Sequence, residues 1–305
     1  MLNNKGKYKS EVFQIMQNYY ESFFPLSNNR KLSYMGYGDN NQNTVFFFHG
    51  FGSSVHAIHP DTNILDQYNI RFFAVNRPGY GDSELKLDYS MEDYADWVNE
   101  FMFANAIDKT SLIGWSAGGL YSQVFTDKYP EKVTSLNLVS SAIPLNSGET
   151  KAVLSGNWKM IRNMNRYIPF MTKSYFKSLS KKVSKNLDAV IQESVKQMVE
   201  EDKIVINDPI IKPAIIKGTV EGYRNSGKGV YYDARALCKK INAPKNKTFN
   251  GKVHIWQGGA DTIWTSETSN YLRQKYSHST YNFIDQAGHL LYLSHWDEIL
   301  KTSVS

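Results

Sequence analysis

Residues 114–119 read GWSAGG and place Ser116 between two glycines, in the pattern G-x-S-x-G. The pattern is typical of a serine that projects from a tight, strained turn between a strand and a helix, where small neighbours let the two elements approach. A serine hydroxyl in such a place can attack a carbonyl carbon once a base takes its proton. Ser116 is therefore the candidate nucleophile, although the pattern alone does not identify an enzyme.

A base for this serine is expected further along the chain, because a serine hydroxyl is hardly ionised at neutral pH. His289 is the candidate, since it follows a predicted strand in the segment DQAGHL and would lie at the carboxyl edge of the sheet. The other histidines fall inside a predicted strand or helix, belong to another motif, or have no partner pattern. They are His49, His56, His59, His254, His278 and His295.

The base in turn needs an acceptor that holds its tautomer and orientation. Asp261 follows the predicted strand 253–257 through Gly-Gly-Ala and would also lie at the carboxyl edge of the sheet. Two alternatives remain open here: Asp261 could instead cap the helix that follows it, or Asp285, four residues before His289, could be the acceptor. Asp285 lies at a strand end and has less freedom to approach the imidazole.

The segment HGFG at residues 49–52 directly follows another predicted buried strand. Acyl transfer builds negative charge on a carbonyl oxygen, and each backbone N–H aimed at that oxygen contributes roughly 3 kcal/mol. We assign these donors to the backbone N–H groups of Phe51 and Ala117, which form the expected oxyanion hole. The alternative for residues 49–52 is an ordinary glycine turn. Patterns of phosphate-binding loops are missing from the sequence.

The elements that must position these residues alternate between strand and helix, which predicts a parallel sheet with crossover helices. The short apolar runs have the composition of strands buried on both faces. Strands are expected at 44–48, 70–75, 111–114, 135–139, 253–256 and 280–284, with an antiparallel edge strand at 31–37. Helices are expected at 91–107, after Ser116, at 266–276 and at 290–301.

Residues 147–247, called the inserted segment below, interrupt this alternation with helical, lysine-rich sequence that is punctuated by Pro169, Pro209 and Pro213. The inserted segment has 20 basic and 9 acidic residues, a net charge of +11, whereas the rest of the chain has a net charge of −5. Its apolar side could form an acyl pocket, and its basic side could bind an anionic membrane surface weakly or attract an anionic substrate. The alternative is that the basic residues form an ordinary solvent-exposed face of the inserted segment, while its apolar side packs against the core.

The composition and the cysteine count further limit the class of protein that this chain can be. The chain has 305 residues, 41% of them hydrophobic, which is enough for a packed core. The single cysteine, Cys238, cannot form an internal disulfide and gives no support to a cysteine-rich metal site. The sequence lacks a signal peptide and any apolar run long enough to span a membrane, so a cytoplasmic protein without a transmembrane segment is expected, with only its first few residues loose.

Taken together, His49-Gly50, the segment RPGYGDS at 77–83, Gly114–Gly119, Asp261 and Gly288-His289 resemble the α/β-hydrolase superfamily. The resemblance implies a mostly parallel central sheet with helices on both faces. It also implies a core formed by residues 1–146 and 248–305 and a helical cap, or lid, formed by 147–247. It gives Arg77 and Asp82 a scaffold role. Serine at position 116 argues against the branches that use aspartate there.

The predicted activity is hydrolysis of a carboxylic ester in two acyl-transfer steps, as in a carboxylesterase or a monoacylglycerol lipase, without a metal or an organic cofactor. The expected partner is a small-molecule ester with an apolar acyl or alcohol group; no nucleic acid is expected, and the oligomeric state is not predicted. Thioester, amide or C–C bond hydrolysis and acyl transfer remain open alternatives, as does a non-catalytic signalling protein that binds a ligand.

Overall fold

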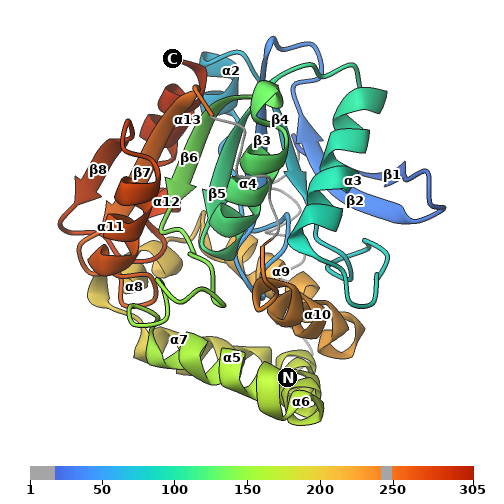
Figure 1. Ribbon diagram of the computed structural model, residues 1–305, viewed down its shortest axis with the longest axis vertical. Coiled ribbons are helices and arrows are strands. Elements are labelled where there is room, and N and C mark those ends of the chain that lie inside the picture. Colours follow the sequence, from blue (N-terminus) through green and yellow to red (C-terminus); the bar gives the residue numbers. More distant parts are fainter. Residues whose placement is uncertain (1–17, 242–248) are drawn as a thin grey trace.

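The computed structural model describes residues 18–241 and 249–305, which form one eight-stranded sheet in the order β1-β2-β4-β3-β5-β6-β7-β8 (Figure 1). The strands from β3 to β8 are parallel to one another, and β1 and β2 are antiparallel additions at the edge formed by β4. Their bounds are β1 Tyr20–Pro25, β2 Lys31–Tyr37, β3 Asn43–Phe48, β4 Ile70–Val75, β5 Thr110–Trp115, β6 Val133–Val139, β7 Lys252–Gly258 and β8 Thr280–Ile284. The predicted fold class, an α/β-hydrolase fold with a mostly parallel sheet, is confirmed.

All seven predicted strands are present, and the structure has one further strand, β1, that was not predicted. Residues 31–37 form the antiparallel strand β2, but β2 is not the edge of the sheet, because Tyr20–Pro25 pairs outside it as β1. The outer strand escaped prediction because its side chains alternate between half-buried and exposed, so it lacks the continuous apolar run of an inner strand.

Alternating residues of each inner strand fill two separate cores, one on each face of the sheet. In β3, Phe46 and Phe48 pack with α3 (Met91–Ala104) and α4 (Ala117–Lys128), whereas Val45 and Phe47 pack with α13 (Trp296–Val304). The period of two along a strand sends successive side chains to opposite faces. A strand covered by helices on both faces must therefore be apolar throughout, as β3 to β6 largely are.

The helices of the core begin and end close to the predicted residues, with one correction. Helix α3 begins after Ser90, whose hydroxyl accepts the Asp93 N–H at 3.1 Å in a capping box. The predicted single closing helix is instead two helices, α12 (Leu291–Ser294) and α13, because His295 between them has φ −120° and ψ 32°. The remaining core helices are α2 (Asn63–Gln67), the short η1 (Pro130–Lys132) and α11 (Ser266–Lys275).

The inserted segment supplies the helices between β6 and β7. They are α5 (Gly156–Tyr167), α6 (Pro169–Lys185), α7 (Leu187–Gln197), α8 (Glu200–Asn207), α9 (Lys212–Gly222), η2 (Asn225–Gly227) and α10 (Lys228–Leu237). Figure 1 shows α5, α6 and α7 as an outer layer at the bottom of the view, with α8, α9 and α10 nearer the sheet. The domain bounds at 146/147 and 247/248 stay a prediction, and the second falls outside the described residues, as do residues 1–17, where a loose start was expected.

A search for membrane-spanning helices in the described part of the chain found none with the required length and apolarity. The longest helix of the inserted segment, α6, contains several lysines.

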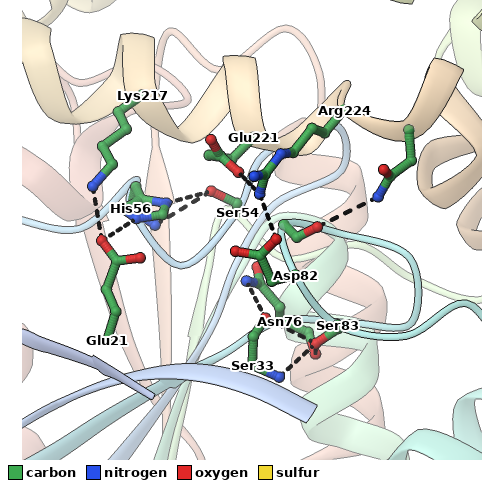
Figure 2. A network of polar contacts seen from close by, with 12 residues as sticks. Glu21, Ser33, Ser54, His56, Asn76, Asp82, Ser83, Lys217, Glu221 and Arg224 are labelled. Carbon is green, nitrogen blue, oxygen red and sulfur yellow. Dashed lines mark hydrogen bonds and ion pairs between the residues drawn. The ribbon is translucent and has the colours of Figure 1, made fainter. Parts of the chain in front are cut away.

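Several ion pairs and hydrogen bonds fasten α9 and its following turn to the core (Figure 2). Lys217 pairs with Glu21 of β1 at 2.8 Å, and the same carboxylate oxygen lies 2.9 Å from Nε2 of His56. Arg224 pairs with Asp82 at 2.8 Å. His56, for which the sequence offered no partner, is thus held by a strand that the sequence did not predict.

A buried ion pair makes a second connection between the inserted segment and the core. The Arg77 guanidinium lies 2.8 Å from Asp233 of α10, and both side chains are 0% exposed. Asp233 also accepts hydrogen bonds from the hydroxyls of Tyr80, Tyr89 and Tyr121 at 2.7, 3.2 and 2.6 Å. A buried ion pair must be surrounded by such donors to offset the loss of hydration. These contacts agree with the scaffold role expected for Arg77 and Asp82.

Asp233→Asn should lower the free energy of unfolding by about 3–5 kcal/mol, because it leaves the Arg77 charge buried without a counter-charge. The matched control is Asp88→Asn, which removes the same charge from the half-exposed Arg235–Asp88 pair and should cost less than about 1 kcal/mol. Urea unfolding of the two variants gives the comparison. Equal losses would contradict the importance assigned to the buried pair.

Candidate active site

Ser116 lies between β5 and α4 in a backbone conformation that a residue with a side chain seldom adopts, with φ 55° and ψ −123°. Neighbouring segments hold it there: its N–H donates to the Val139 carbonyl at 3.0 Å, and its carbonyl accepts the Ala142 N–H at 2.9 Å. Strain of this kind persists only where the surrounding structure fixes the backbone, and it is common at active sites. The turn places the serine side chain at the carboxyl edge of the sheet, at 4% exposure.

The glycines around Ser116 are required by the close approach of strand and helix. A Cβ on Gly114 would lie 2.6 Å from the Cα of Gly119, and one on Gly118 would collide with the Phe48 carbonyl. Real Cβ atoms do not come so near to backbone. The sequence-based reason for small residues beside the serine is confirmed at both positions.

Asp261 and His289 are joined directly. Nδ1 of His289 lies 3.0 Å from Oδ2 of Asp261, and both residues are buried. The other Asp261 oxygen accepts the N–H groups of Ile263 and Trp264 at 2.8 and 3.1 Å, so it orders its own turn and does not cap α11. Asp285, the alternative acceptor, is exposed at the end of β8.

The surroundings of His289 favour its protonated form. Burial by itself lowers the pKa of the imidazole, but the charge and hydrogen bond of Asp261, together with the charge of Asp202, raise the pKa above its ordinary value of 6.5. His49 has the opposite balance, since burial and the nearby Arg77 charge hold its pKa well below that value. Of these two buried histidines, only His289 has carboxylates that stabilise a proton received from a nucleophile.

Two tryptophans connect Ser116 to the Asp261–His289 pair. Trp264, three residues after Asp261, donates its indole N–H to the Ser116 Oγ at 3.3 Å. Trp115, which precedes Ser116, donates its indole N–H to the His289 carbonyl at 3.0 Å, and its ring centroid lies 5.5 Å from that of His289. Among the described residues, no direct hydrogen bond joins the Ser116 hydroxyl to the His289 ring. The structure therefore brings the three predicted residues into one buried neighbourhood and bonds two of them.

The loop with the predicted oxyanion donors is held from behind by Arg77. Its guanidinium donates to the carbonyl oxygens of His49 and Gly50 at 2.6 and 3.0 Å. This fixes the backbone on which Phe51 lies, while Ala117 is the first residue of α4. Neither the Phe51 N–H nor the Ala117 N–H donates to another residue in the described ranges. Both donors are thus free to bind a ligand oxygen.

Aromatic side chains of the inserted segment pack against residues that adjoin the serine. Trp158 of α5 stacks on Trp264 with ring centroids 5.1 Å apart, and Phe51 packs against Trp158 and Phe176 at 5.3 and 5.7 Å. The sequence indicated an apolar side of the inserted segment but not the role of Trp264. The only signal for it was an aromatic residue three positions after the candidate acid.

Within residues 18–241 and 249–305, no group of three or more His, Cys, Asp or Glu side chains is placed to hold a metal ion. The buried Asp261–His289 pair beside Ser116 has the side chains needed for proton transfer and nucleophilic attack.

Comparison with known proteins identifies the family of this chain. The alpha/beta hydrolase fold family matches residues 43–295. The pimeloyl-[acyl-carrier protein] methyl ester esterase of Neisseria meningitidis is 25% identical over 256 residues, which cover 82% of this chain and 72% of the relative. The protein of the same name from Legionella pneumophila is 24% identical and covers 83% and 90%. A shorter match, 34% identical, covers 32% of this chain and 36% of the Wigglesworthia glossinidia brevipalpis protein of that name.

Solved structures agree on the fold. The enol-lactonase of Burkholderia xenovorans superposes with a TM-score of 0.68 at 16% identity and covers 93% of this chain and 98% of its own. An esterase from Exiguobacterium antarcticum gives 0.65 at 17% identity and covers 93% and 99%. The family match extends over most of the chain and includes Ser116, Asp261 and His289, so this chain belongs to the alpha/beta hydrolase fold family.

Proposed function

We propose that the protein is a serine hydrolase that cleaves a carboxylic ester, with Ser116 as nucleophile, His289 as base and Asp261 as the residue that orients the base. The observation that carries the proposal is the buried hydrogen bond between Asp261 and His289 beside a serine held at φ 55°. A structural histidine would not require a strained serine at the same edge of the sheet. The names of the relatives, which are esterases, favour the same reaction.

In the first step, the Ser116 oxygen bonds to the ester carbonyl carbon while His289 takes the hydroxyl proton. The tetrahedral oxyanion would accept hydrogen bonds from the N–H groups of Phe51 and Ala117. The C–O bond to the alcohol then breaks, and the alcohol leaves with the proton from His289. Because the Trp264 indole donates to the serine oxygen, the Ser116 hydroxyl keeps its own proton available for the base.

In the second step, water attacks the acyl-serine while His289 again accepts a proton, and the acid is released as Ser116 regains its hydrogen. His289 must move into hydrogen-bond contact with Ser116 for either transfer. Catalytic hydrogen bonds are often long before substrate binds and tighten in the complex.

The substrate class follows from the cover over the serine, which we propose acts as a cap. Trp158, Trp264 and Phe51 offer apolar surface to an acyl or alcohol group. Since Ser116 is nearly inaccessible, these side chains must move for a substrate to enter.

The net charge of +11 on the inserted segment would attract an anionic substrate or carrier. An ester carried by an acyl carrier protein, as in the relatives' name, is therefore a second candidate substrate.

Ser116→Ala should abolish labelling by a fluorophosphonate and reduce kcat for a short p-nitrophenyl ester by about 10⁴-fold or more, because the nucleophile is removed. His289→Ala should reduce kcat to a similar extent, and Asp261→Asn somewhat less. Ser184→Ala, a change to an exposed serine of α6, is the control. Labelling of the Ser116→Ala protein would exclude this residue as the nucleophile.

The pH dependence follows from the raised pKa of His289. The base works only when neutral, so kcat/KM should rise with pH through this pKa, and its acid limb should have a midpoint above 6.5. Asp261→Asn should move the midpoint down, because it removes the charge that stabilises the imidazolium. The measurement is kcat/KM between about pH 5 and 9. A midpoint well below 6.5 would contradict the electrostatic balance described above.

Trp158→Ala should change acyl-chain preference by removing a ring that closes the pocket beside Trp264. We expect the ratio of kcat/KM for an octanoyl ester to that for an acetyl ester to rise by about tenfold, a difference of about 1.4 kcal/mol in transition-state binding. Tyr167→Ala, at an exposed position of the same helix, is the control. The same ratio in both variants would exclude Trp158 from the acyl pocket.

A further inference from the structure

Asp202 of α8 is an acidic residue of the inserted segment whose carboxylate points into the loop that contains His289. Its Oδ2 accepts the His289 backbone N–H at 2.9 Å, and its Oδ1 accepts the Leu290 N–H at 2.7 Å. An acidic residue in the first turn of a helix ordinarily lies in solvent near its own helix N-terminus. Asp202 is instead only 6% exposed, and both of its oxygens bind backbone 87 and 88 residues away.

The loop is built to receive this carboxylate. A Cβ on Gly288 would lie 2.5 Å from both Cγ and Oδ1 of Asp202, so only glycine allows the approach. On the other side of His289, its carbonyl accepts a hydrogen bond from the Trp115 indole at 3.0 Å. The backbone of His289 is therefore held at its N–H by the inserted segment and at its carbonyl by β5, beside Ser116.

The charge of Asp202 acts on the imidazole as well as on the backbone. The titratable and charged groups facing His289 from the elements packed around it are Asp261, from the loop after β7, and Asp202, from α8; both raise the pKa of His289 against the effect of burial. Burial, together with the charge of Asp261, raises the pKa of Asp202 above its usual value, although the two N–H bonds and His289 oppose this shift. An ionised carboxylate offers an acceptor to each of the two N–H donors, which an amide cannot do.

We propose that Asp202 is a positioning residue for His289: by binding the backbone of the base from helix α8, it makes the geometry and charge of the base depend on the docking of the inserted segment. The inference rests on the proposed function, in which His289 accepts the Ser116 proton. It assigns to the inserted segment a part in the reaction beyond covering the pocket. Helix α8 packs against α12, which begins two residues after His289, so displacement of α8 would release the loop directly.

The test compares Asp202→Asn with the matched control Asp188→Asn, which removes an exposed carboxylate from α7 of the same segment. With a short p-nitrophenyl ester, Asp202→Asn should lower kcat by about tenfold or more, because the base is misplaced, with little change in KM. The acid limb of kcat/KM should move to lower pH by about half a pH unit or more, since a negative charge near the imidazolium is lost. Asp188→Asn should change neither.

A second readout does not require turnover. The ring resonances of His289, assigned by comparison with His289→Gln, can be titrated by NMR in the Ser116→Ala protein with and without Asp202→Asn. The midpoint should fall by a similar amount in the Asp202→Asn protein. If the wild type proves inactive and unlabelled, the proposed function fails while this titration still tests the effect of Asp202 on His289.

A folded Asp202→Asn protein with the kcat and the His289 titration of the wild type would overturn the proposal. So would a fall in kcat without a shift of the titration, which is the result expected of a residue that only supports the fold. Should Asp202→Asn fail to fold, Gly288→Ala is the alternative variant, because the added methyl group pushes the carboxylate aside without removing its charge. It should also lower kcat and the His289 midpoint, and wild-type values in this variant would contradict the proposal.

Discussion

The arrangement of this protein depends on one tight turn, in which β5 ends at Trp115 and α4 begins at Ala117 with Ser116 at φ 55° between them. The turn is possible because Gly114 lets α4 approach β5 and Gly118 lets α4 approach the end of β3. It also fixes where the other parts of the site must lie. The parallel strands bring their carboxyl ends to the same edge, so the loops after β3, β7 and β8 meet above the serine.

The inserted segment reaches each part of the candidate site by a different contact. Trp158 stacks on the tryptophan bonded to Ser116, Asp202 holds the backbone of His289, and Asp233 pairs with the arginine behind the loop at residues 49–52. Helices that only covered a pocket would need no more than apolar contacts with the core. Two of these three contacts are carboxylates buried against the core, where an unpaired charge would be costly. This favours a segment that docks in one definite position.

Electrostatics distinguishes the two buried histidines near the serine. His289 lies beside two carboxylates and His49 beside a guanidinium, so the pKa of the first is raised and that of the second lowered although both are buried. Both residues are histidines, and both are buried. The sign of the neighbouring charge decides which imidazole can hold a proton taken from a hydroxyl.

The sequence by itself determined the parallel sheet, since strands buried on both faces are continuously apolar and can be recognised without their partners. It also indicated Ser116, Asp261 and His289, because each follows a strand and local sequence shows where strands end. It missed the outer strand β1, the break at His295 and the contacts of Trp264 and Asp202. The contacts of Trp264 and Asp202 join residues 148 and 87 positions apart that only folding brings together. An acidic residue in a polar helix looks the same in the sequence whether its carboxylate meets water or the backbone of a histidine.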